Sequence, residues 1–149
     1  MSRLLAIDYG ERRIGLALSD PTGTLASPLD TLVRRRGKRP PLRAIEALAQ
    51  THAIGGLVVG LPLDFEGHEN EWCAEIRAVG DELSRRLEIP VTYVDERFSS
   101  VQAERALREI GVKPSRRDAK GRVDAAAAAV ILQGHLDALR AAPSSDHDL

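Results

Sequence analysis

Three acidic residues in separate segments of the sequence have the type and placement for metal-assisted hydrolysis. Asp8 lies inside an apolar run, Glu96 follows a second apolar run, and Asp124 precedes a series of alanines. A carboxylate in a buried strand is costly unless it is paired or bound to a cation, so Asp8 in particular requires a partner. Oxygen-only ligands suit Mg²⁺ or Mn²⁺, and two such ions can activate water against a phosphodiester. The carboxylates therefore predict a hydrolytic, metal-dependent nuclease site.

Each carboxylate also has a simpler interpretation. Asp8 would cap a hairpin, and Glu96 with its neighbour Asp95 would be an exposed pair bridged to Arg97. Because side chains alternate along a strand, only one of Asp95 and Glu96 can face the same crevice as Asp8. Asp124 alone is most simply the N-cap of a helix. The three taken together favour the catalytic interpretation more than any one of them does.

The elements that must position these residues follow from hydrophobic spacing. Short apolar runs predict strands at Arg3–Tyr9, Arg13–Ser19, Thr24–Val33, Gly56–Leu61 and Val91–Asp95. Helical spacing and stop signals predict helices opening at Pro40–Pro41 and spanning Glu69–Glu88, Ser99–Ile110 and Val123–Arg140. A hairpin followed by alternating strands and helices is typical of an α/β domain with a mixed sheet, helices on both faces and the first strand near the centre. Sites in such sheets lie beyond the carboxyl ends of parallel strands, which is where the segment Gly60–Pro62 and two of the carboxylates are expected.

Length and composition limit the alternatives. The chain has 149 residues, which suits one domain over residues 1–140 with a flexible tail at 141–149. A formal net charge of -1 means that nucleic-acid binding must come from local clusters of charge. One cysteine, Cys73, and histidines without metal-motif spacing exclude disulfides and structural zinc. Because no apolar run reaches membrane-spanning length and no signal peptide is evident, we expect a cytoplasmic protein without membrane contact.

Basic residues are clustered in two segments that this sequence predicts to be loops. The first spans Arg34–Arg39, and the second runs through a polar segment between Gly111 and Gly121, glycines that would let it move, and leads directly into Asp124. Either cluster could simply be solvated, but the second is favoured as a phosphate-binding segment because of its position. The predicted nucleic-acid contacts are Arg13, Arg97, Lys113, Arg116, Arg117, Lys120 and Arg122.

An ordered set of motifs resembles a known bacterial family. The motifs are Ala6–Gly10, Arg13–Ala17 with Ser19-Asp20, Val59–Pro62, Asp95–Ser100 with Ala103-Glu104, and Asp124–Ala126 with Ile131–Gln133. From Leu5 to about Leu136 the chain resembles the YqgF (RuvX) family, which has an RNase H-like fold and is similar to the RuvC Holliday junction resolvases. The resemblance implies a metal-dependent nuclease that processes the 5′ end of pre-16S rRNA, with Asp8, Glu96 and Asp124 as metal-binding catalytic carboxylates.

The sequence leaves alternatives open. A Holliday junction resolvase acting on branched DNA would use the same chemistry and would need a homodimer with two sites. A non-catalytic assembly factor would hold folded RNA in ribosomal precursor particles, with the carboxylates binding only structural Mg²⁺. A P-loop ATPase is disfavoured because Leu16 and Ala17 stand where Lys and Ser/Thr are required. The chain also departs from the YqgF (RuvX) family pattern in the segment after Pro62. This segment carries extra acids where the family usually has an Asn and a Gly-rich turn.

Overall fold

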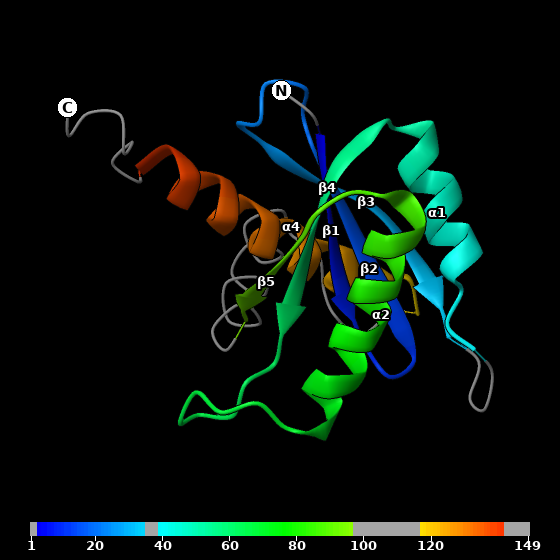
Figure 1. Cartoon of the computed structure of the whole chain (residues 1–149), viewed down its shortest axis with the longest axis vertical. Coiled ribbons are helices and arrows are strands. Elements are labelled where there is room, and N and C mark those ends of the chain that lie inside the picture. Colours follow the sequence, from blue (N-terminus) through cyan, green and yellow to red (C-terminus); the bar gives the residue numbers. More distant parts are fainter. Residues whose placement is uncertain (1–2, 35–38, 97–116, 142–149) are drawn as a thin grey trace.

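The computed structural model describes residues 3–34, 39–96 and 117–141, and for residues 117–124 the backbone alone (Figure 1). The strands are β1 (Arg3–Tyr9), β2 (Arg13–Ser19), β3 (Ala26–Val33), β4 (Ile54–Leu61) and β5 (Val91–Asp95). The helices are α1 (Leu42–Thr51), α2 (Glu71–Leu87) and α4 (Arg117–Ala141). Within these ranges, no helix is both long enough and apolar enough to span a membrane.

The strands form a mixed sheet in the order β3-β2-β1-β4-β5, which confirms the predicted architecture with β1 at its centre. β1 pairs antiparallel with β2 and parallel with β4, while β5 runs parallel to β4. β3 is an edge strand whose register shifts near Pro28, as a strand proline leads one to expect. The carboxyl ends of β1, β4 and β5 therefore meet at one edge of the sheet.

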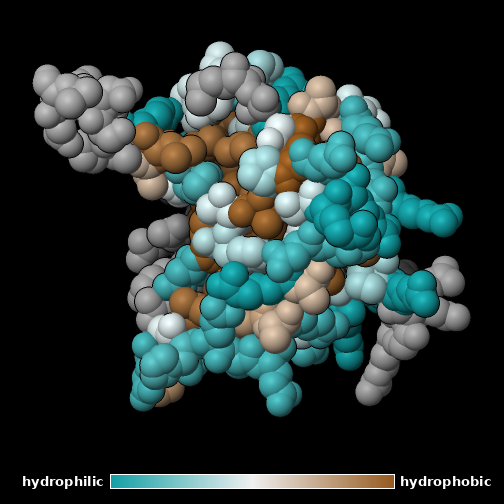
Figure 2. Space-filling model, in the orientation of Figure 1, coloured by the Kyte–Doolittle hydropathy of each residue, from teal (hydrophilic) through white to brown (hydrophobic). Residues whose placement is uncertain are grey.

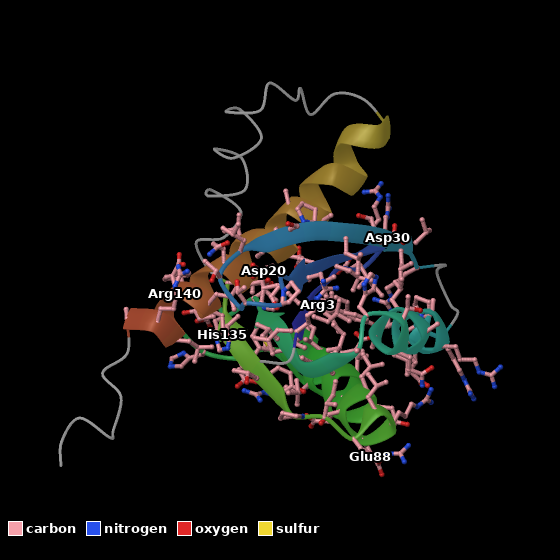
Figure 3. The ribbon with its side chains drawn as sticks, turned by 90° about the horizontal axis from the view of Figure 1, so that it is seen from above. Arg3, Asp20, Asp30, Glu88, His135 and Arg140 are labelled. Carbon is pink, nitrogen blue, oxygen red and sulfur yellow. The ribbon has the colours of Figure 1, made fainter. Side chains whose placement is uncertain are left out.

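The two faces of the sheet have different coverings. Leu5, Ile7 and Tyr9 of β1 belong to a core cluster with residues of α1 and α2, whereas Ala6 belongs to a second cluster with residues of α4. Figures 1 and 3 show the sheet lying between α4 on one side and α1 with α2 on the other. Because side chains alternate along β1, Asp8 shares the face of Ala6 and therefore lies on the α4 side.

Helix α2 begins and ends at identifiable caps. The Asn70 side chain accepts a hydrogen bond from the backbone N–H of Cys73 at 3.0 Å, and Glu88 adopts the left-handed conformation that stops the helix. The helix is therefore slightly shorter than the predicted Glu69–Glu88. Cys73 is buried in the core as expected. The outward-facing residues of α1 and α2 form a largely hydrophilic surface (Figure 2).

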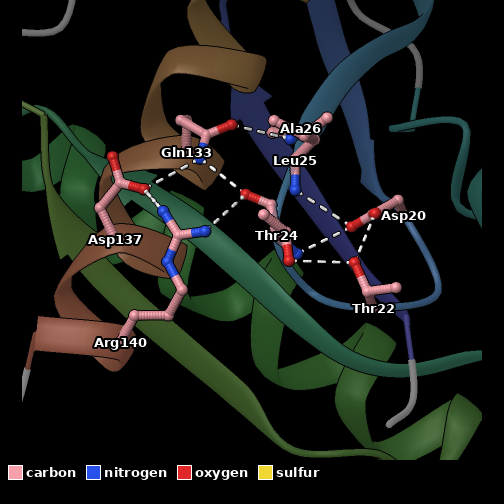
Figure 4. Close-up of polar contacts among 8 residues, drawn as sticks. All are labelled: Asp20, Thr22, Thr24, Leu25, Ala26, Gln133, Asp137 and Arg140. Carbon is pink, nitrogen blue, oxygen red and sulfur yellow. Dashed lines mark hydrogen bonds and ion pairs between the residues drawn. The ribbon is translucent and has the colours of Figure 1, made fainter.

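Helix α4 is fastened to the loop between β2 and β3 (Figure 4). Gln133 accepts from the backbone N–H of Ala26 at 2.9 Å and donates to the carbonyl of Thr24 at 2.9 Å. Arg140 adds a bond to the same carbonyl and an ion pair with a neighbouring aspartate of the helix. The Asp20 carboxylate accepts the backbone N–H groups of Thr24 and Leu25, which keeps the loop in the conformation that Gln133 contacts.

Besides α2, the bounds of β4, β3 and α4 differ from those predicted. β4 begins two residues earlier, at Ile54 rather than Gly56. β3 begins at Ala26 rather than Thr24, because the preceding residues form the turn held by Asp20. α4 begins at Arg117, so Gly121 lies inside the helix and the second half of the predicted polar loop is helical. Its charged residues include good helix formers, so polarity alone was a poor signal for a loop. The predicted helix Ser99–Ile110 and most of the 141–149 tail lie outside the described residues.

Candidate metal and nucleic-acid site

Asp8 lies near the carboxyl end of the central strand, on the face that α4 covers. It is half-buried, and its partner in the β1–β2 ladder is Gly15, which has no side chain to cover it. The next turn is closed by the backbone N–H of Gly10, which donates to the carbonyl of Arg13 at 2.9 Å. The tight hairpin thus ends one strand position beyond Asp8 and leaves the carboxylate at the open edge of the sheet.

Glu96 is brought to the same place by β5. Its backbone N–H donates to the carbonyl of Leu61 at 3.1 Å, which extends the pairing of β5 with β4 by one residue. The Glu96 and Asp8 carboxyl groups are hydrogen-bonded to each other. Asp95 is exposed, so the alternation argument is confirmed: of the two neighbouring acids, Glu96 is the one that faces Asp8.

The electrostatics of this pair are those of two partly buried acids held close together. Burial, followed by the negative charge of Asp8, the hydrogen bond with it and the charge of Asp95, raises the pKa of Glu96 to about 8. Without a cation the two carboxyl groups hold a proton between them near neutral pH. A divalent cation relieves the same repulsion, and an oxygen-only donor set is the one that Mg²⁺ and Mn²⁺ take. The residues present therefore fit such an ion.

The third predicted ligand, Asp124, is in the middle of a helix rather than at its start. α4 begins at Arg117, so the alternative role of Asp124 as an N-cap is wrong. The following residue, Ala125, is buried, and Ala128 packs in one cluster with Ala6 of β1. The Asp124 backbone therefore lies over the sheet face that carries Asp8. Among the side chains that the structure describes, no three acidic, histidine or cysteine residues form a metal-binding group, and the Asp124 side chain is not one of those described.

The predicted phosphate contacts are only partly described. Arg13 is half-buried at the start of β2, at the hairpin end of the site. Arg97, Lys113 and Arg116 lie outside the described residues. Arg117, Lys120 and Arg122 fall in the N-terminal part of α4, with their backbone alone described. The helix thus carries these three residues of the second basic cluster, which directly precede Asp124.

Arg34, the first residue of the other basic cluster, has an internal role that the sequence did not reveal. Its guanidinium lies 4.5 Å from the centre of the Tyr9 ring and 5.7 Å from that of Trp72, and it donates to the carbonyl of Gly10 at 3.1 Å. Glu75 of α2 lies 3.6 Å from the same group. Arg34 therefore braces the hairpin after Asp8 from the opposite face. An aromatic residue directly after Asp8 was the only sequence signal for this contact.

The acidic segment after β4 is an ordered loop. The Asp64 carboxylate accepts the backbone N–H groups of His68 and Glu66 at 2.8 and 3.0 Å, and these bonds, led by that of His68, hold its pKa below the usual range. Phe65 is 90% exposed at this loop. The extra acids here are thus partly used in building the loop itself.

The match to a family model decides which proteins this chain is related to. The model described as RuvX, Holliday junction resolvase, matches residues 2–138. The chain belongs to the RuvX family. Curated relatives carry the provisional name pre-16S rRNA nuclease: one from Chloroflexus aurantiacus is 42% identical over 98% of this chain and 94% of its own length. One from an Anaeromyxobacter species is 47% identical over 91% and 96%.

The fold of this RuvX-family chain is shared with solved resolvase structures. The Thermus thermophilus RuvC structure in complex with a Holliday junction superposes with a TM-score of 0.58, at 14% identity, over 93% of this chain and 96% of that one. This likeness supports the predicted RNase H-like fold.

Proposed function

We propose that this RuvX-family chain is a divalent-metal-dependent nuclease that hydrolyses phosphodiester bonds in structured nucleic acid and processes the 5′ end of pre-16S rRNA. The observation that carries the proposal is the pair of carboxyl groups, Asp8 and Glu96, hydrogen-bonded at the carboxyl edge of the central strands. The names of the curated relatives supply the substrate. We assign the activity to a nuclease domain over residues 1–140, acting in the cytoplasm on ribosomal precursor particles.

In this mechanism Asp8, Glu96 and Asp124 would be the oxygen ligands of the cation. Mg²⁺ or Mn²⁺ bound there supplies a nucleophilic water at neutral pH and stabilises the charge on the leaving oxygen. Asp8, on the central strand, would hold the ion together with Glu96, which follows β5, and Asp124, which lies in α4. With a cation bound, Glu96 would release its proton to solvent, and both carboxylates would be charged ligands of the ion.

The basic side chains hold the substrate. Sequence-independent affinity for RNA or DNA comes from Lys and Arg on phosphates, and contacts of this kind set the register of the scissile bond. We assign this role to Arg13, Arg97, Lys113, Arg116, Arg117, Lys120 and Arg122. The position of the last three at the start of α4, directly before Asp124, supports phosphate binding next to the metal ligands.

A second candidate function is cleavage of branched DNA. It is favoured by the family description, Holliday junction resolvase. Symmetric cleavage of two strands requires two sites, so this function would need a homodimer. The chemistry at Asp8 would be the same, and the two functions differ only in the substrate that is cut faster.

The test compares a labelled pre-16S 5′ leader with a four-way DNA junction, each with Mg²⁺, Mn²⁺ or a chelator. Asp8→Asn is the catalytic variant, and Asp30→Asn is its matched control, because Asp30 is an exposed carboxylate on edge strand β3 of the same sheet. We expect metal-dependent cleavage that Asp8→Asn abolishes and Asp30→Asn retains, with the leader cut faster. Binding without cleavage under every metal would instead support the non-catalytic assembly factor.

A further inference from the structure

Gly60, near the end of β4, lies directly under the Glu96 carboxyl group. A Cβ atom built at this glycine would be 2.4 Å from Oε2 of Glu96 and 3.1 Å from its carboxyl carbon. On the same face, the Cδ1 atom of Ile131 in α4 would be 2.9 Å away. Even the smallest side chain at position 60 therefore has no room while Glu96 and Ile131 keep their places.

The strand itself cannot move aside to make that room. β4 is hydrogen-bonded to β1 on one side and to β5 on the other, and the β1–β4 register, with Ile7 beside Val59, brings Gly60 next to Asp8. Ile131 is buried in the core cluster under α4. Of the atoms that would meet a new Cβ, the carboxyl group at the end of the flexible Glu96 side chain moves most easily. Any such movement would disturb the hydrogen bond that this carboxyl group makes with Asp8.

We propose that Gly60 is a positioning residue of the acidic site: its missing side chain leaves the space in which the Glu96 carboxylate lies against Asp8, below Ile131. The purpose of this arrangement rests on the proposed function, in which the two carboxylates hold a metal ion. A residue that orients a metal ligand in this way commonly changes metal affinity by about 10- to 100-fold when it is altered.

The steric part of the proposal is tested by a double-mutant cycle on the thermal stability of the metal-free protein. The variants are Gly60→Ala, Glu96→Ala and the two combined, with Gly56→Ala, alone and combined with Glu96→Ala, as the matched control. Gly56 lies on the same strand, and a Cβ there would meet Leu4 Cδ2 at 2.8 Å, so it is crowded by an unrelated side chain. We expect the loss of melting temperature caused by Gly60→Ala to fall by about half or more when Glu96→Ala is present, whereas the loss caused by Gly56→Ala is unchanged.

Strictly additive losses for Gly60→Ala and Glu96→Ala would overturn the proposal. If Gly60→Ala alone does not fold, the combined variant still decides the matter. Folding of Gly60→Ala with Glu96→Ala supports the proposal, because the nearer of the two conflicting side chains is gone, and failure of both to fold overturns it.

The functional part is tested with Mn²⁺ titrations, followed by electron paramagnetic resonance, and with cleavage kinetics. We expect Gly60→Ala to bind Mn²⁺ about tenfold or more weakly and to lose kcat while KM for the RNA leader is unchanged. Gly56→Ala should stay within about twofold of the wild type in both. Equal Mn²⁺ affinity in the two glycine variants would overturn the proposal. A wild-type chain that neither binds Mn²⁺ nor cleaves would refute the proposed function, and the stability cycle would then alone decide the role of Gly60.

Discussion

Removal of divalent cations should make the stability of this protein depend on pH through Glu96. The pKa of Glu96 is raised to about 8 by burial and by the charge of Asp8, against 4.5 for an ordinary glutamate. Between these two values the folded state holds a proton that the unfolded state has released. The free energy of unfolding must therefore fall as the pH rises, by at most about 1.4 kcal/mol per pH unit for a single proton.

The assay is urea unfolding in the presence of a chelator, at closely spaced pH values from about pH 5 to about pH 8.5, a window chosen around the two pKa values. Glu96→Gln cannot ionise and should flatten the profile. Asp8→Asn removes the neighbouring charge and so lowers the folded-state pKa of Glu96, which should make the decline end at a lower pH. Asp30→Asn should follow the wild type. Added Mg²⁺ should restore stability most strongly at high pH, because it binds the ionised pair. Parallel profiles for the wild type and Glu96→Gln would refute the account of the buried pair.

Three further predictions concern substitutions in helix α4. Gln133→Ala removes both bonds to the β2–β3 loop and should lower the free energy of unfolding by about 1–3 kcal/mol, measured by urea denaturation. Gly134→Ala, the adjacent control, has no atom within 4 Å of its new Cβ and should raise stability by about 0.5–1 kcal/mol; a loss would show that the helix is strained there. Replacing Arg117, Lys120 and Arg122 by Ala should weaken RNA binding and reduce the slope of log affinity against log salt by about 0.7 for each lost phosphate contact, and an unchanged slope would exclude these side chains.

The sequence by itself determined the strands and the order in which the elements follow one another. Continuous apolar runs predict buried strands, and Pro28 indicates an edge strand, because these signals depend on neighbouring residues only. β1 and β2 were predicted with the bounds that the structure has. Their short hairpin, followed by alternating helices, placed β1 at the centre of a mixed sheet. Asp8 could therefore be recognised as a charge in a central strand.

Only the tertiary structure decided which side chains meet at the site. The alternation of side chains along a strand shows that only one of Asp95 and Glu96 can face Asp8, but not which one. The pairing of β5 with β4 shows that it is Glu96. The close approach of Glu96 and Ile131 to Gly60 joins three elements that are far apart in the chain. Such contacts arise from the packing of whole elements, which a local pattern of residues does not encode. For that reason the sequence identified the acids, and the packed sheet and helix supplied the space in which two of them lie hydrogen-bonded to each other.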